Sequence, residues 1–225
     1  MTACRRGWTI SFSRVAKWRG ASRSIRVKGF FLDEFLNFLE EKYSWRMAED
    51  VVEGSGVKSG GLYLWLNDYP SEEFERLLME TAKHAGKDAH EIARMFGRHL
   101  FGYLRRRFPE LLAGSRDSFS FLSQLPTRLA LKFDYWFRYD NQPSVLVMSE
   151  DDRLKIRLRA LPWQVMVVAG LVEEALAFFR DAELAELRLT GEGEPACLTL
   201  RSLRPEMEDA GREGKIALLN SPVPL

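Results

Sequence analysis

The sequence predicts an α+β domain with a helical N-terminal half, followed by a four-stranded antiparallel sheet and a helix packed on it. Two observations carry this prediction. Apolar residues recur at helical spacing up to Pro143, and after Pro143 they alternate with polar residues as in strands. The second half then runs in the order strand, strand, helix, strand, strand, which is typical of an antiparallel sheet.

The helical half is predicted to contain four amphipathic helices, each located by its apolar stripe and by capping residues. Acidic residues follow Ser71 directly, as in the first turn of a helix, and proline suits a first turn because its missing N–H has no intrahelical acceptor there. The first predicted helix covers residues 30–43. The second follows an N-cap at Ser71 and runs to His84, and the third follows a cap at Asp88 and ends before Pro109. The fourth has Pro126 in its first turn.

Residues 153–160 alternate between apolar and basic side chains, so they predict a strand with one buried face. Leu154, Ile156 and Leu158 form the apolar set, and a row of basic residues faces the other way. That row is either a solvated sheet face or a surface for an acidic partner. Residues 164–180 predict a helix, and residues 186–190 and 197–203 predict a hairpin.

The 225-residue chain is 46% hydrophobic and 29% charged, which excludes disordered and coiled-coil classes. Residues 1–28 contain basic side chains but no acidic ones, so the remainder is mildly acidic and has no basic footprint for nucleic acid. We predict a disordered basic extension over residues 1–26, a domain over residues 27–203 and a loose tail over residues 204–225. Alternatively, the extension is a targeting segment or a membrane-surface helix, or its start codon has been assigned too far upstream.

Two cysteines, Cys4 and Cys197, are too few for a disulfide framework and favour a reducing, cytoplasmic location. No apolar run approaches the ~20 residues that cross a bilayer. The sequence also lacks a nucleophile elbow, a Walker-type glycine loop and histidine or cysteine pairs at metal-binding spacing. A non-catalytic protein is therefore expected.

Several segments, taken together and in order, resemble bacterial H-NOX (heme–nitric oxide/oxygen binding) domains. The resemblance covers about residues 27–203 and not the basic extension. The segments that carry it are VKGFFLDEFLNFLEEKY at 27–43, SGGLY at 59–63, NDYPSEEF at 67–74, MFGRHLFGYL at 95–104 and FLSQL at 121–125.

The resemblance implies a heme b cofactor, held by a proximal histidine and by a Tyr-x-Ser-x-Arg motif that clamps the propionates. The position of the proximal histidine falls on Ala130, which cannot ligate iron. The positions of the clamp fall on Leu158, Ala160 and Pro162, which carry none of the family's polar groups. Since an axial ligand and a charge-assisted clamp secure heme, the expected cofactor is none, or an unidentified apolar ligand.

Other residues offer only weak replacements as iron ligands. The histidines of the chain are His84, His90 and His99, and none falls on the helix that carries Ala130. His99 is interpreted as a packed helix residue, with iron ligation as the alternative. Tyr103 and Tyr135 are further candidates as tyrosinate ligands.

The leading hypothesis is a non-catalytic H-NOX-like sensory or regulatory module that has lost ordinary heme ligation. Phe133, Trp136 and Phe137 then either fill the heme hollow or line a surviving apolar pocket. The alternatives are a nitric oxide or gas sensor with non-standard heme ligation, and a constitutive interaction scaffold. The resemblance implies a signalling partner, such as a histidine kinase, a diguanylate cyclase or a chemotaxis receptor.

Overall fold

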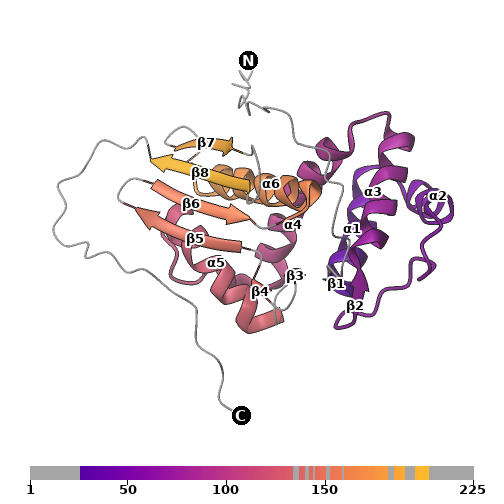
Figure 1. Ribbon diagram of the computed structural model, residues 1–225, viewed down its shortest axis with the longest axis horizontal. Coiled ribbons are helices and arrows are strands. Elements are labelled where there is room, and N and C mark those ends of the chain that lie inside the picture. The colour runs from indigo at the N-terminus through magenta and orange to yellow at the C-terminus, as the bar shows by residue number, and fades with distance from the viewer. Residues whose placement is uncertain are drawn as a thin grey trace, which may run out of the picture.

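The computed structural model places helices α1 to α3 at one end of the molecule and a large sheet at the other, with α4 and α6 between them (Figure 1). The structure describes residues 26–133, 137–139, 142–143, 145–150, 153–158, 160–181, 185–190 and 196–202. Among these residues, no helix is long and apolar enough to cross a membrane.

The helices and strands follow each other in the predicted general order. The helices are α1 (Gly29–Lys42), α2 (Trp45–Ser55), α3 (Ser71–Ala85), α4 (Ala89–Arg107), the 3-10 helix η1 (Pro109–Leu112), α5 (Ser118–Phe133) and α6 (Pro162–Phe178). The strands are β1 (Arg26–Lys28), β2 (Asp68–Pro70), β3 (Phe137–Tyr139), β4 (Gln142–Pro143), β5 (Val145–Glu150), β6 (Arg153–Leu158), β7 (Ala185–Thr190) and β8 (Ala196–Ser202).

The described strands form two antiparallel sheets. The large sheet has the order β5-β6-β8-β7, and it confirms the predicted four-stranded antiparallel sheet. A small sheet of order β2-β1-β3-β4 joins the start of the domain to the segment after α5. Neither this small sheet nor helix α2 was expected. The α+β class itself is confirmed.

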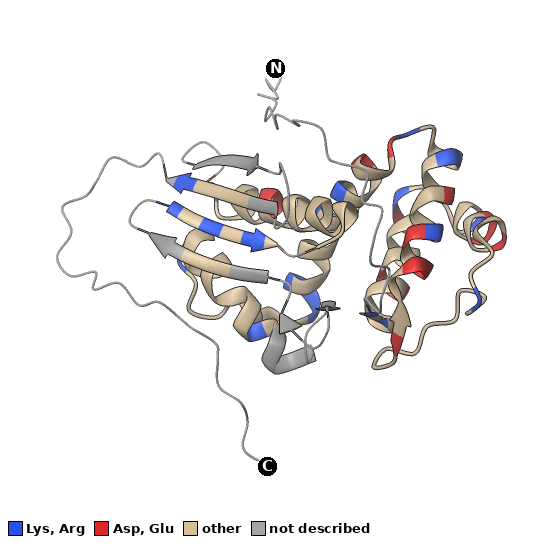
Figure 2. Ribbon diagram, viewed as in Figure 1, with Lys and Arg blue, Asp and Glu red and all other residues tan. Residues whose placement is uncertain are grey.

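Strand β6 has the predicted two-faced pattern. Leu154, Ile156 and Leu158 are buried, whereas Arg153 and Arg157 are exposed, and Figure 2 shows the basic residues along this strand. The strand ends at Leu158, two residues earlier than expected, so the predicted buried face is confirmed but the predicted length was too great.

The start of α5 differs from the prediction. Pro126 lies inside the helix and not in its first turn, because the helix begins earlier, at Ser118. Asp117 provides the missed start signal: its Oδ1 accepts a hydrogen bond from the backbone N–H of Ser120 at 2.7 Å, as an N-cap side chain does. The helix therefore tolerates an interior proline at the cost of one backbone hydrogen bond.

Of the two N-caps predicted for the preceding helices, one is confirmed and one is wrong. Asp88 caps α4 as predicted, since its Oδ1 accepts from the backbone N–H of His90 at 2.8 Å. Ser71, in contrast, is the first residue of α3 and is buried, and Pro70 takes the cap position. Glu72 and Glu73 lie in the first turn of α3 as expected.

Helices α4 and α6 cross in close backbone contact, and each carries a glycine at the crossing. A Cβ atom on Gly97 of α4 would lie 2.0 Å from the carbonyl oxygen of Val167, and one on Gly170 of α6 would lie 2.0 Å from that of Arg94. Beside the crossing, Glu173 of α6 accepts hydrogen bonds from Arg94 and from Arg98, the latter at 2.8 and 3.0 Å. Only glycine fits at either crossing point, because the opposing atoms are backbone and cannot move aside.

Replacing Gly97 or Gly170 by alanine should therefore destabilise the protein. We expect Gly97→Ala and Gly170→Ala each to cost about 1–3 kcal/mol in the free energy of unfolding, measured by urea titration. Gly102→Ala on α4 is the matched control. Its Cβ would meet only the end of the Arg106 side chain at 3.4 Å, so helix propensity should make it stabilising by about 0.5–1 kcal/mol. Equal stability of Gly97→Ala and Gly102→Ala would contradict the crossing.

Candidate functional site

Helix α5 carries the position at which the family resemblance expects an iron ligand. Ala130 lies in this helix, although its side chain is outside the described residues. The helix is fixed at its start, where the backbone N–H and the hydroxyl of Ser118 donate to the buried carboxylate of Asp181 at 2.8 and 2.7 Å. Nearer its end, Arg128 donates to the carbonyl oxygen of Ala113 at 2.7 Å. The helix that carries alanine at this position is thus anchored at its start and near its end.

The positions expected to clamp heme propionates are apolar and are divided between different elements. Leu158 ends β6, and its side chain is 1% exposed within the core. Ala160 lies in the connection after the strand, and Pro162 is the first residue of α6. These residues offer neither a positive charge nor a side-chain hydrogen-bond donor. They do not fit the two carboxylates of a heme held in the family's manner.

The predicted pocket-lining residues can be located only in part. Phe133 ends α5 and Phe137 begins β3, but their side chains lie outside the described residues. Trp136 and Tyr135 lie outside them altogether. Their part in filling or lining a hollow therefore stays a prediction.

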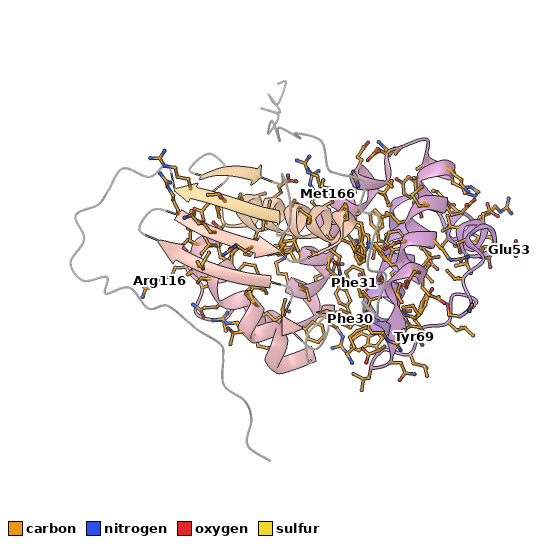
Figure 3. The ribbon with its side chains drawn as sticks, in the orientation of Figure 1. Phe30, Phe31, Glu53, Tyr69, Arg116 and Met166 are labelled. Atoms are coloured by element: carbon orange, nitrogen blue, oxygen red, sulfur yellow. The ribbon has the colours of Figure 1, made fainter. Side chains whose placement is uncertain are left out.

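Described aromatic rings from four helices fill the junction between the helical end and α6. Phe31 of α1 lies with its ring centroid 5.0 Å from those of Phe74 and Phe96, and Figure 3 shows Phe31 in the middle of the molecule. Phe35 is 4.8 Å from Phe74, and Trp163 of α6 is 4.4 Å from Phe74. These rings pack against one another and form a continuous aromatic core.

His99 lies beside this core and is bound by carboxylates. Its Nε2 lies 2.6 Å from Oε1 of Glu34, and its Nδ1 lies 3.6 Å from Oε2 of Glu41. The ring also packs against Phe38, with a centroid distance of 5.4 Å. Because both ring nitrogens face carboxylates, His99 acts as the counterpart of the buried Glu34. This supports the structural interpretation of His99 over that of an iron ligand.

Sequence reasoning missed Glu34 as the partner of His99. The signal was present, since Glu34 lies between the apolar residues Phe31, Phe35 and Phe38, and a carboxylate on an apolar helix face needs a buried partner. The distance of 65 positions between the two residues hid the pair.

The other candidate ligands also have surface or structural surroundings. His84 lies 3.4 Å from Glu80, and His90 lies 3.8 Å from Asp88, both on helices other than α5. Burial raises the pKa of Tyr103 to about 12, with a smaller contribution from Glu34, so its phenol keeps its proton near neutral pH. In the described residues, no group of three or more His, Cys, Asp or Glu side chains is arranged to hold a metal ion.

Comparison with known proteins agrees with this fold. The sequence profile of the Haem-NO-binding family matches residues 28–182, which is more than half of the chain. The chain belongs to the Haem-NO-binding, or H-NOX, family. The search of curated proteins returned no match.

Solved H-NOX structures share the fold at low sequence identity. An Fe(II) unliganded H-NOX protein from K. algicida superposes with a TM-score of 0.67 at 18% identity, over 82% of this chain and 100% of that one. A single-residue variant of the T. tengcongensis H-NOX gives 0.64 at 20% identity, over 80% and 99%. At such identities the likeness establishes the H-NOX fold but not the role of any one residue.

A structural role for His99 predicts a specific pattern of stability. His99→Ala should lower the free energy of unfolding by about 3 kcal/mol, because it leaves the Glu34 carboxylate buried without its partner. Glu34→Gln in the same chain should recover part of that loss, and urea unfolding of the double-mutant cycle measures the coupling. Additive losses would show that the two side chains do not interact.

Proposed function

We propose that this H-NOX domain is a non-catalytic regulatory module that does not hold heme through an axial histidine. The observation that carries the proposal is the placement of all three histidines. They lie on α3 and α4 next to carboxylates, whereas Ala130 stands on α5 at the expected ligand position. Heme that lacks an axial bond and a clamp would be held by apolar contact alone.

The buried carboxylates of the described residues support a role without catalysis. Each one has a structural partner that accounts for its burial: His99 for Glu34, Tyr63 and the neighbouring loop for Glu73, two arginines for Glu173, and Ser118 for Asp181. A general acid or base would instead face an open site. The proposed regulatory output is therefore contact with a signalling protein, of the kinase, cyclase or receptor type that the family resemblance implies.

Hemin titration tests the proposal directly. The unmodified protein should show no sharp Soret band at one hemin per chain. Ala130→His should bind hemin at least ten-fold more tightly, because it returns a nitrogen donor to α5. Ser123→His is the matched control, since residue 123 is exposed on the same helix and its histidine faces solvent.

One result would contradict the proposal, and a different result would contradict the assignment of Ala130. A stoichiometric Soret band in the unmodified protein that shifts with nitric oxide would overturn the proposal in favour of non-standard ligation. If Ala130→His bound hemin no better than Ser123→His, the assignment of the ligand position to Ala130 would be wrong.

A further inference from the structure

The connection between α2 and β2 exposes an unusual set of large apolar side chains. Residues 57–67, here termed the leucine loop, present Leu62, Leu64 and Leu66 with exposed fractions of 82%, 67% and 79%, and Trp65 with 37%. Single exposed leucines are ordinary in proteins, but four neighbouring apolar residues on one loop form a patch of the kind that binds another apolar surface.

A buried carboxylate holds the first half of the leucine loop in place. Glu73 of α3 accepts hydrogen bonds from the backbone N–H of Lys58 at 3.1 Å, the hydroxyl of Ser59 at 2.6 Å and the hydroxyl of Tyr63 at 2.9 Å. Tyr63 is buried, whereas the leucines on either side of it are exposed. The leucines are therefore exposed on a backbone that hydrogen bonds hold in place.

The second half of the leucine loop lies directly against the start of α1. The backbone N–H of Gly29 donates to the carbonyl oxygen of Asn67 at 2.8 Å, and a Cβ atom on Gly29 would lie 2.0 Å from the carbonyl oxygen of Leu64. The Tyr69 hydroxyl accepts from the N–H of Leu64 at 2.8 Å, and Figure 3 shows Tyr69 at this end of the molecule. With its backbone held on both sides, the leucine loop presents its apolar side chains in a fixed geometry, which lowers the ordering cost of binding.

Charged residues of both signs border the second half of the leucine loop. The Lys28 ammonium lies 3.0 Å from the Asp68 carboxylate, and Arg26 donates to the carbonyl oxygen of Asp68 at 2.8 Å. Asp33 accepts from the Trp65 indole at 3.3 Å. The two cations are thus matched by two carboxylates, and this border gives a partner of a single strong charge no electrostatic advantage.

A second copy of the chain matches both features of this surface. In a contact with two-fold symmetry the same loop lies on both sides, so apolar side chains meet apolar side chains. A border of a single sign would repel its own copy. A border that carries both signs lets a cation of one copy approach a carboxylate of the other.

The size of the patch is sufficient for a small dimer interface. A specific interface buries on the order of 500 Å² or more on each copy, and the exposed surface of the three leucines and Trp65 is itself of that order. Contacts at this lower limit of size are reversible, so we expect a dissociation constant on the order of micromolar.

We propose that this protein forms a two-fold symmetric dimer through the leucine loop, in which the three leucines and Trp65 of each copy pack against those of the other. The charged residues of β1, β2 and α1 lie at the rim of the contact. Because the loop belongs to the helical end of the molecule, the dimer joins the helical ends and leaves the large sheets at its outer ends (Figure 1). The proposal goes beyond the regulatory function and does not depend on whether heme is bound.

Sedimentation equilibrium of the full chain tests this proposal. The unmodified protein should be a dimer at roughly tens of micromolar and should dissociate on dilution. High salt should leave the dimer intact, because the contact is mainly apolar. Leu64→Ser with Leu66→Ser should raise the dissociation constant at least ten-fold. Trp45→Ser is the matched control, since Trp45 is 59% exposed but follows the far end of α1, and this variant should dimerise as the parent does.

Charge exchange at the loop tests the symmetry of the contact. Leu64→Asp and Leu64→Lys should each be monomeric, because a two-fold contact brings the like charges of the two copies together. An equimolar mixture of the two variants should recover a dimer, since each loop then meets a loop of opposite charge.

Three results would overturn the proposal. One is an unmodified protein that stays monomeric at these concentrations, whether or not its leucine loop binds lipid vesicles or another protein. Another is an undiminished dimer in the Leu64→Ser, Leu66→Ser variant with its thermal unfolding unchanged. The third is a mixture of the two charged variants that stays monomeric, which would show that the two loops do not face each other.

Discussion

The architecture depends on the contact between α4 and α6, where two helix backbones touch because both carry glycine. Gly97 and Gly170 bring each helix against a carbonyl oxygen of the other, and Glu173 then ties α6 to Arg94 and Arg98 on α4. Helices α1 and α3 pack on one side of this pair, and the large sheet lies on the other side (Figure 1).

Strong periodicity made much of this fold predictable, and weak local signals account for what was missed. The stripe through Phe31 and Phe35 predicted α1 to within a residue at each end, and the alternation at Leu154 and Ile156 predicted the buried face of β6. Helix α2 was missed although Ala48, Val51 and Val52 recur at helical spacing, because it is short and was obscured by the Gly/Ser cluster at its end. Strands β1 to β4 span only two or three residues each, so they show no period. Pro126 misplaced the start of α5 because the cap at Asp117 was overlooked.

The candidate site was predictable where it depends on residue type, and not where it depends on distant pairs. The lack of donor atoms at Ala130 is visible in the sequence alone. The carboxylate that binds His99 comes from another helix, and the carboxylate of Glu73 gathers a loop that precedes it in the chain. In each case the polar groups of helices α1, α3 and α4 bind one another or a neighbouring loop, and so stabilise the fold. The proposed regulation through contact rests on these structural roles.

The heme content of the protein as isolated shows whether this domain has lost ordinary heme ligation. The full chain, produced in cells well supplied with heme and purified without added hemin, should contain far less than one heme per chain by pyridine hemochrome assay. A ratio close to one, with an intact iron–nitrogen or iron–oxygen axial bond in its resonance Raman spectrum, would show that the domain ligates heme after all.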